Sequence, residues 1–403
     1  MNGGTSPATL GPVLLERAVA GGSVLGHDAD GRVVLVRDGL PGESVSVAVE
    51  SDKPRLVRGV VDGVLDAADE RVEPQCRFVA EGCGGCDLQH ASEALQASMR
   101  VEVVRDALSH LAGVDNVPVQ QVEPAATAAG RTTMRLAVLD GRLALRRHRS
   151  HELVAIPECL VAHPALGPVL AEGRFPGAKE VTVRASASTG DVVAVVAPDS
   201  RTAEVPDDVR VVGADELGRN QRAWIHEEVD GHELRVSAQS FFQSGPVAAA
   251  ALGRAVKRAL GGFAPATDRL VDLYGGIGLF TVLLGARNAV VVERSAAAVA
   301  DARVNTGHLG AKVVKVAVGG WRPSAADAVV ADPSRKGLGA EGVRAVVATG
   351  APRVALVSCD PAALGRDVAL LAEQGWDATG IEVVDMFPHT HHVEAVTTLV
   401  RKG

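Results

Sequence analysis

Short valine-rich runs, separated by helical segments, fill the last third of the chain and constrain its fold most. They are apolar almost throughout, which is typical of strands that are buried on both faces of a sheet. Such strands alternating with helices predict a parallel α/β sheet over residues 237–403, and the alternating stretch EAVTTLVR is expected at a sheet edge. The runs are LVDLY (270–274), AVVVE (289–293), KVVKV (312–316), AVVAD (328–332) and RVALVS (353–358).

A glycine-rich turn follows the first of these runs, in the stretch DLYGGIGLF (272–280). Glycines between a strand and a helix let a ligand approach the helix N-terminus closely. Glu293 ends the next strand, where a carboxylate can accept hydrogen bonds from ribose hydroxyls. The loop lacks the full GxGxxG spacing of a pyrophosphate site, which favours S-adenosylmethionine over NAD as the cofactor.

Three chemically capable side chains fall at or near the ends of later strands. Asp332 ends AVVAD, Cys359 follows VALVS, and Glu394 follows DMFPHTHHV. Ligands of such sheets bind at the carboxyl ends of the strands, so we expect these side chains in one cleft. A thiol there is a candidate nucleophile, although a lone cysteine is more often a small buried apolar residue.

Four of the five cysteines suggest a metal or cluster site. Cys76, Cys83 and Cys86 lie within eleven positions, and Cys159 is the best candidate for a fourth ligand, with His90 as the nearer alternative. The spacing alone leaves two identities open, a tetrahedral zinc ion or an iron–sulfur cluster.

The rest of the chain is rich in strands. Residues 11–66 contain short β-branched runs punctuated by Gly, Asp and Pro, which predicts a small all-β barrel. A helix is expected over residues 91–111, and residues 132–237 are again strand-rich, with hairpins at LDGR and VDGH.

The overall charge of −8 argues mildly against nucleic-acid binding, but the charge is uneven. Residues 131–149 hold six arginines against the single acid Asp140, and this stretch is the candidate phosphate-binding face, with salt-dependent binding. No apolar run reaches the ~20 residues that cross a bilayer, and no signal peptide is evident at Met1–Pro12. We therefore expect a cytoplasmic, monomeric enzyme with no membrane contact.

Seven stretches together resemble the RNA uracil-C5 methyltransferase family, in its branch with a TRAM domain and an iron–sulfur cluster. They follow the family's order over nearly the whole chain, although Cys76 and Cys83 are separated by six residues where the family more often has five. The stretches are LPGESV, CGGCDLQH, SFFQSG, DLYGGIGLF, DPSRKG, VSCDPAALGRD and DMFPHTHHVEAV.

The resemblance implies a multidomain protein. Its parts would be an OB-like TRAM β-barrel (8–66), a central β-rich α+β domain with a [4Fe-4S] cluster (67–236), and a Rossmann-like methyltransferase domain (237–403). Helix 93–113 would pack on the catalytic domain despite its early position. The implied cluster ligands are Cys76, Cys83, Cys86 and Cys159.

The resemblance also implies a reaction, the formation of 5-methyluridine in RNA. Cys359 would attack C6 of uracil, C5 would take the methyl group of S-adenosylmethionine, and Glu394 would remove the C5 proton. Gln243, Tyr274, Glu293 and Asp332 match cofactor-contacting positions, and Phe241 or Phe242 could stack on a base. The favoured substrate is 23S rRNA. The alternatives are the tRNA T-loop uridine, a non-catalytic iron–sulfur RNA-binding protein and, least favoured, a radical enzyme acting on tRNA.

Overall fold

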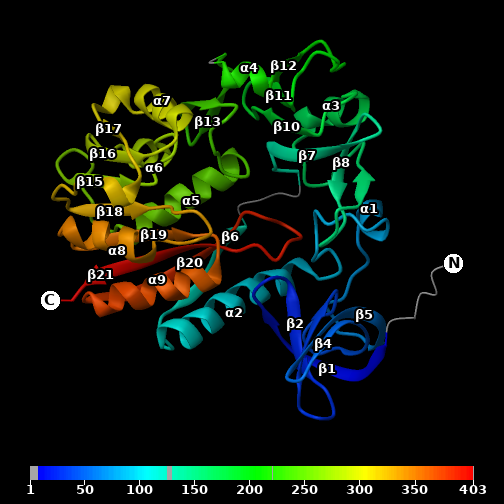
Figure 1. The fold of residues 1–403 in the computed structure, drawn as a ribbon. Coiled ribbons are helices and arrows are strands. Elements are labelled where there is room, and N and C mark those ends of the chain that lie inside the picture. Colours follow the sequence, from blue (N-terminus) through cyan, green and yellow to red (C-terminus); the bar gives the residue numbers. More distant parts are fainter. Residues whose placement is uncertain (1–7, 125–128, 220, 403) are drawn as a thin grey trace.

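The computed structural model describes residues 8–124, 129–219 and 221–402. The described residues form four β assemblies: a closed barrel, a six-stranded sheet, a two-stranded hairpin and an eight-stranded sheet. In Figure 1 the barrel lies below, the six-stranded sheet at the upper right and the eight-stranded sheet at the left. The long helix α2 (Glu93–Ala112) runs between the barrel and the eight-stranded sheet.

The N-terminal barrel confirms the all-β prediction. Its five strands close in the order β1-β2-β3-β5-β4 around valines and leucines that are almost fully buried. The carboxylate of Glu43, in the stretch LPGESV, is also fully buried and accepts hydrogen bonds from Leu40 N (2.8 Å) and Arg71 Nη2 (2.8 Å). The strands are β1 (Thr9–Val19), β2 (Ser23–His27), β3 (Val33–Arg37), β4 (Ser44–Lys53) and β5 (Leu56–Asp66).

The middle of the chain forms a six-stranded sheet in the order β12-β11-β10-β7-β8-β9. The two predicted hairpins are confirmed: Asp140–Gly141 and Asp230–Gly231 have positive φ at both positions, as type I′ turns require. The elements are α1 (Arg77–Ala80), β7 (Thr133–Leu139), β8 (Arg142–Arg146), β9 (Leu153–Ala155), α3 (Gly167–Glu172), β10 (Glu180–Ala185), β11 (Val192–Ala197), β12 (Val209–Gly213), α4 (Ala214–Gly218), β13 (Trp224–Val229) and β14 (His232–Ser237).

The C-terminal sheet has the order β17-β16-β15-β18-β19-β21-β20-β6. It carries α5 and α6 on one face and α2, α8 and α9 on the other, which confirms an α/β architecture. The elements are β6 (Val119–Pro124), α5 (Pro246–Ala259), β15 (Arg269–Leu273), α6 (Leu279–Leu283), β16 (Asn288–Glu293), α7 (Ala296–Asn305), β17 (Lys312–Lys315), β18 (Ala328–Ala331), α8 (Gly339–Ala348), β19 (Arg353–Ser358), α9 (Pro361–Glu373), β20 (Trp376–Asp385) and β21 (Glu394–Arg401).

The prediction that EAVTTLVR forms a sheet edge is wrong. These residues form β21, which lies inside the sheet and pairs antiparallel with both β19 and β20. The edge is β6, a strand from the first third of the chain that pairs parallel with β20. The division of the chain at residues 66 and 236 stays a prediction, and the structure adds that β6 and α2 pack with the C-terminal sheet.

Helix α2 has two apolar faces, because two bodies pack against it. Met99 and Val103 join the barrel core, whereas Val104 and Leu108 join the core of the C-terminal sheet. Ser92 caps its N-terminus by accepting a hydrogen bond from Leu95 N (3.2 Å). A Cβ atom at Gly365 of α9 would lie 2.6 Å from the Ala107 carbonyl oxygen, so this glycine allows α9 to approach α2 closely. Within the described residues, no helix has both the length and the apolar character that spanning a membrane requires.

Replacing Glu43 tests what closes the barrel. Glu43→Ala leaves the Arg71 guanidinium and buried amides without their acceptor, so we expect a loss of roughly 3 kcal/mol in local unfolding free energy. Hydrogen exchange of the barrel peptides measures it. Glu50→Ala, which breaks the exposed pair of Glu50 with Arg37, is the control and should change little. Equal effects of the two variants would contradict this role.

The same interaction predicts a pH dependence. Burial raises the pKa of Glu43, but the hydrogen bonds and charge of Arg71 outweigh it and leave the pKa below its ordinary value. A carboxyl whose folded-state pKa is lowered adds stability above its unfolded pKa of about 4.5 and loses it as the pH falls through the folded value. Barrel protection should therefore fall below about pH 4.5 in the wild type and less steeply in Glu43→Ala.

Candidate active site

Four parallel strands of the C-terminal sheet bring their carboxyl ends to one edge. β15 leads into Tyr274 and the glycine loop, β16 ends at Glu293, β18 leads into Asp332, and β19 leads into Cys359. β21 runs antiparallel to these strands, so its first residue, Glu394, lies at the same edge. Ala395, the next residue, pairs with Ser358 at the end of β19. The sheet thus collects most of the predicted site residues.

Cys359, Glu394 and Asp332 influence one another electrostatically. Burial, followed by the charges of Glu394 and Asp332, raises the pKa of the Cys359 thiol to about 11, while Arg335 acts in the opposite direction. Glu394 is almost fully buried, and burial together with Asp332 raises its pKa well above the ordinary value. The site therefore favours neutral forms of all three groups, a bias that a nearby cation would reverse.

Asp332 connects this group to the glycine loop. Burial and the neighbouring Asp272 raise its pKa to about 7, against the hydrogen bond that Gln243 Nε2 donates to its Oδ2 (3.3 Å). Asp272 is fully buried, and burial raises its pKa to about 7 as well. Its Oδ2 accepts a hydrogen bond from Thr281 Oγ1 (2.8 Å), whereas its Oδ1 has no partner among the described residues. Asp272 begins the glycine-rich stretch DLYGGIGLF, but the sequence did not predict it as a site residue.

Glu293 lies against the glycine loop, as its position in the sequence predicts. Its carboxylate accepts hydrogen bonds from Gly276 N (3.2 Å) and Ser295 N (2.6 Å). Each oxygen keeps a lone pair for a further donor, so the carboxylate can receive ribose hydroxyls. Tyr274 has a left-handed φ of 57°, and its hydroxyl lies beside Gly342 of α8.

The SFFQSG loop (240–245) reaches the same edge from another part of the chain. Gln243 is buried, Phe242 belongs to the hydrophobic core, and Phe241 is 71% exposed. Of the two phenylalanines, therefore, only Phe241 is available to contact a base. The loop is held by Arg184 of the six-stranded sheet, which donates to Ser237 O (2.8 Å) and Ser240 O (2.7 Å).

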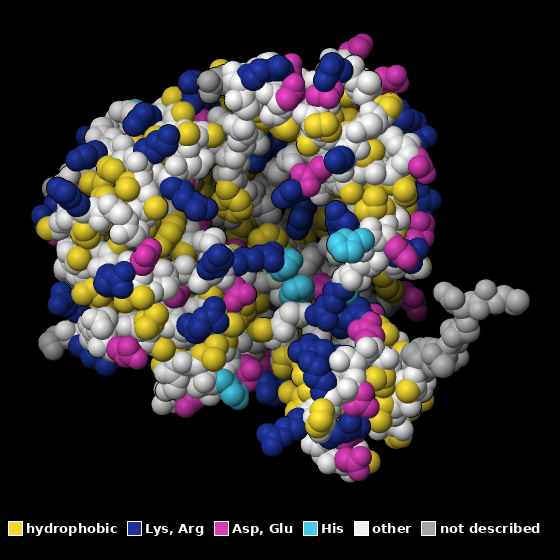
Figure 2. Space-filling model, in the orientation of Figure 1, with side chains coloured by type: hydrophobic (Ala, Val, Ile, Leu, Met, Phe, Trp, Pro, Cys, Tyr) yellow, Lys and Arg dark blue, Asp and Glu magenta, His cyan; other side chains and the backbone are white. Residues whose placement is uncertain are grey.

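Arg335 was missed by sequence reasoning. It lies on the exposed loop after β18, and its charge acts on both Cys359 and His392. Its position in the DPSRKG stretch, three residues after Asp332, is the sequence feature that could have identified it as a site residue. Figure 2 shows a hollow in this face between the two larger bodies, with Lys and Arg side chains around it and histidines at its lower edge.

A separate cavity of about 80 Å³ is lined by four cysteines, Cys76, Cys83, Cys86 and Cys159, together with apolar side chains. His90 does not line it, because its ring lies beside Arg71 and hydrogen-bonds the backbone of Gly39. Burial raises the pKa of Cys83 and Cys159 and that of Cys86 to about 11. Among the described residues, no three His, Cys, Asp or Glu side chains form a group that could hold a metal ion.

The cysteine cavity nevertheless contains features that favour thiolates. Backbone N–H groups hydrogen-bond two of the thiols: that of Gly85 to Cys83, and those of Val161 and Ala162 to Cys159. The side chain of Gln89 lowers the pKa of Cys86 against the effect of burial, although its Nε2 has no hydrogen-bond partner within the described residues. Donors to a sulfur stabilise its negative charge.

Only some of the arginines in the stretch 131–149 are available to bind phosphate groups. Arg131 lines the cysteine cavity, and Arg135 and Arg147 form ion pairs with Glu180 and Glu152. The side chains of Arg142, Arg146 and Arg149 are exposed. Its use as a phosphate-binding face stays a prediction.

The curated proteins that this chain resembles are RNA methyltransferases. The chain is 33% identical to an uncharacterized RNA methyltransferase of Streptomyces avermitilis, over 94% of this chain and 95% of that protein. It is 34% identical to one of Streptomyces coelicolor, over 94% of this chain and 90% of that protein. The chain belongs to the RNA methyltransferase family. No family model matches it.

A solved structure has the fold of this RNA methyltransferase over its whole length. It is the tRNA (uracil-54, C5)-methyltransferase of Pyrococcus abyssi in complex with S-adenosyl-L-homocysteine, at a TM-score of 0.72 and 22% identity. The match covers 96% of this chain and 100% of that chain. At this identity the likeness shows the fold alone.

The raised pKa of Cys359 predicts how the free protein reacts with iodoacetamide. With a pKa of about 11, the thiolate fraction at pH 7 is very small and grows about tenfold per pH unit up to pH 10. The alkylation rate of the Cys359 peptide, followed by mass spectrometry, should grow in the same proportion. Free glutathione is the reference, and a plateau for Cys359 near pH 8.5 would contradict the effect of its neighbours.

Proposed function

We propose that this RNA methyltransferase uses S-adenosylmethionine to form 5-methyluridine. The observation that carries the proposal is the meeting of a thiol, Cys359, with the buried carboxyl of Glu394 and the half-buried Asp332 beside a glycine loop. Uracil C5 is too weakly nucleophilic to take a methyl group directly. A nucleophile and a base at the same site overcome this.

Cys359 starts the reaction after its thiol has given up a proton to solvent. The thiolate forms a bond to uracil C6, and the C5=C6 electron pair moves to make an enolate with an electron-rich C5. C5 then attacks the methyl carbon, the bond between methyl and sulfonium breaks, and S-adenosylhomocysteine leaves. Cys359 lies between the end of β19 and Asp360, the residue that caps α9, so its half-buried thiol is at the carboxyl end of a strand.

Glu394 completes the reaction. Its carboxylate takes the C5 proton, the electron pair re-forms the C5=C6 bond, and the bond between C6 and the Cys359 sulfur breaks to release the thiolate. The buried position that raises its pKa also makes its carboxylate a stronger base.

The cofactor pocket comprises the glycine loop together with Glu293, Asp332, Gln243 and Tyr274. S-adenosylmethionine supplies the methyl group and, as a cation, favours the ionised forms of the neighbouring thiol and carboxyls. Glu293 would receive the ribose hydroxyls. Asp272, which is fully buried next to the glycine loop, has an Oδ1 without a hydrogen-bond partner among the described residues.

The RNA substrate is proposed to be 23S rRNA, with the tRNA T-loop uridine as the alternative. The cysteine cavity and the barrel support the first, by resemblance, and the likeness to a tRNA (uracil-54, C5)-methyltransferase supports the second. The target base would be flipped towards Cys359 and could stack on the exposed Phe241. Mapping 5-methyluridine in the rRNA and tRNA of a deletion strain decides between them.

We propose that Cys76, Cys83, Cys86 and Cys159 hold a [4Fe-4S] cluster with a structural role. The four thiols share one apolar cavity, and backbone N–H groups are directed at two of the sulfurs, those of Cys83 and Cys159, which supports thiolate ligation. With four cysteine ligands, each iron would be fully ligated.

Removing the nucleophile tests the reaction. Cys359→Ala should abolish transfer of labelled methyl from S-adenosylmethionine to RNA, with a loss of at least ~1000-fold, because no enolate can form. Glu394→Gln should instead trap a methylated protein–RNA adduct that survives denaturation. Glu382→Gln, on β20 and paired with Arg258, is the control and should act like wild type. Methylation by Cys359→Ala at the wild-type rate would exclude the mechanism.

Metal analysis tests the cysteine cavity. Anaerobically purified protein should contain about four irons and four sulfides per chain, and Cys159→Ser should lower both. Cys359→Ser is the matched control, because Cys359 lies outside the cavity, and should leave the iron content unchanged. Zinc without sulfide in an active protein would contradict the cluster.

A further inference from the structure

The loop that leads into Glu394 is held in place largely by residues from outside the C-terminal region. This β20–β21 loop, residues 386–393, connects two paired strands, and Val384 of β20 pairs with Glu394 of β21. Pairing fixes the ends of a loop but not the path between them. We propose that Asp87, Gln96 and Arg100 are positioning residues, which hold this loop so that Glu394 faces Cys359. The inference rests on the proposed function.

Asp87 makes the first set of contacts, directly after Cys86. Its Oδ1 accepts a hydrogen bond from His391 N (2.9 Å), and its Oδ2 pairs with His391 Nδ1. The backbone N–H groups of Asp87 and Leu88 both donate to the His389 carbonyl oxygen, at 3.0 and 2.9 Å. The loop before Glu394 is therefore attached to the cysteine stretch through both its backbone and a side chain.

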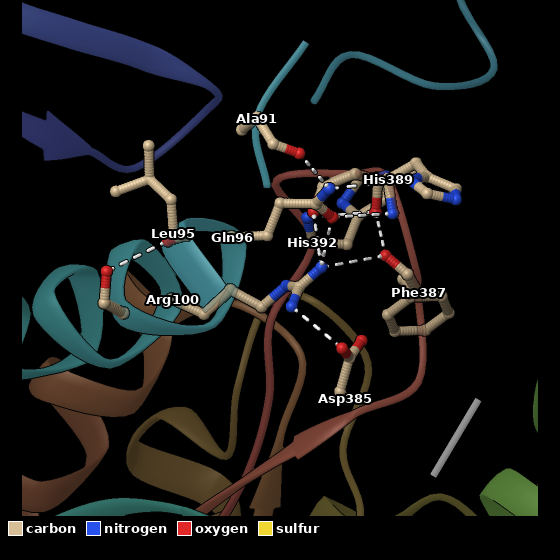
Figure 3. A network of polar contacts seen from close by, with 10 residues as sticks. Ala91, Leu95, Gln96, Arg100, Asp385, Phe387, His389 and His392 are labelled. Carbon is tan, nitrogen blue, oxygen red and sulfur yellow. Dashed lines mark hydrogen bonds and ion pairs between the residues drawn. The ribbon is translucent and has the colours of Figure 1, made fainter. Parts of the chain in front are cut away.

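Helix α2 makes the second set of contacts, shown in Figure 3. Gln96 is buried, accepts a hydrogen bond from His389 N (3.0 Å), and donates to the Ala91 carbonyl oxygen (2.9 Å). Arg100 is 2% exposed and forms an ion pair with Asp385 (3.0 Å) at the end of β20. Its Nη2 also lies 3.4 Å from the carbonyl oxygens of Phe387 and Thr390.

The barrel approaches the same point. A Cβ atom at Gly22, in the β1–β2 turn, would lie 2.7 Å from Asp87 Oδ2 and 3.0 Å from His391 Nδ1. Gly22 has a φ of 75°, so a side chain there would be strained as well as crowded. The Asp87–His391 pair is thus the point at which the barrel, the cysteine stretch and the β20–β21 loop meet.

The anchored residues lie immediately before the base. His391 is three positions from Glu394, and the ring of His392 packs edge-on against Phe387 (5.8 Å) and beside His391 (4.4 Å). A shift of His391 therefore moves the residues that lead into β21. A base that is misplaced by about 1 Å can lose about 100-fold in rate.

Loosening this loop should affect only one step of the proposed reaction, the removal of the C5 proton by Glu394. Addition of Cys359 to C6 and methyl transfer do not use Glu394, whereas release of the product does. Loss of the anchor should therefore slow proton removal and leave the bond between C6 and the Cys359 sulfur in place. A variant with a loosened loop should accumulate the methylated protein–RNA adduct, which a general loss of folding would not produce.

The test measures turnover, adduct and loop mobility in the full-length protein. We expect Asp87→Ala to lower kcat about 100-fold and to lower the KM for RNA with it, because the steps up to methyl transfer are unchanged, to accumulate adduct, and to speed hydrogen exchange over 386–394. Asp87→Asn, whose amide can make both contacts to His391, should recover most of kcat. Asp106→Ala, which breaks the ion pair between the barrel and α2 at Arg17, is the control and should show none of these effects.

Gln96→Met is the second variant, because Asp87 adjoins Cys86 and its replacement could disturb the cysteine stretch. Gln96→Met removes the acceptor of His389 N and should give the same adduct and the same faster exchange. Wild-type kcat, no adduct and unchanged exchange in both variants would overturn the inference. A wild-type protein that neither methylates RNA nor forms adduct in Glu394→Gln would instead defeat the proposed function. The exchange measurement would then still show whether these residues hold the loop.

Discussion

The relative positions of the barrel, α2 and the C-terminal sheet in this RNA methyltransferase depend on the ion pair between the Arg100 guanidinium and Asp385. The guanidinium is buried and paired with Asp385, so α2 is fixed at the end of β20. A buried ion pair is costly to break, because either partner alone would be left as an uncompensated charge. The barrel packs on one face of α2 and the C-terminal sheet on another, so this pair fixes both relative to the loop that leads into Glu394.

The active-site edge is electrostatically unusual. Asp272 and Glu394 are buried and Asp332 is half-buried, all three carboxyls have raised pKa values, and Cys359 has a raised pKa beside them. Groups that are held neutral in the free protein are sensitive to any charge that enters the pocket. In the proposed reaction a cationic methyl donor enters, so cofactor binding and activation of the thiol would be linked.

Much of this arrangement could be predicted from the sequence. The valine-rich strands predict the α/β sheet, and the rule that ligands bind at carboxyl ends groups Glu293, Asp332 and Cys359. The cysteine spacing predicts a shared site, and Cys159 does line the cavity of the other three, although it lies 73 positions after Cys86.

Other features could not be predicted, because they depend on pairing between distant segments. The alternating pattern of EAVTTLVR suggests an edge strand, but β20 pairs with β21 on the side away from β19, so β21 lies inside, and β6 beyond β20 forms the edge. Asp272 is unremarkable in the sequence, and its importance comes from burial beside Asp332. Phe241 and Phe242 are equivalent in the sequence, and only the packing of Phe242 into the core distinguishes them.

The sequence by itself therefore determined the local chemistry: which side chains end which strands, where the chain turns, and which thiols lie together. Periodicity and turn residues act over a few positions, and they carry that information directly. Only the tertiary structure decided that Asp87, Gln96 and Arg100 contact a loop almost 300 residues further along the chain. Such contacts depend on which folded surfaces meet, and buried polar groups then find partners that no local pattern specifies.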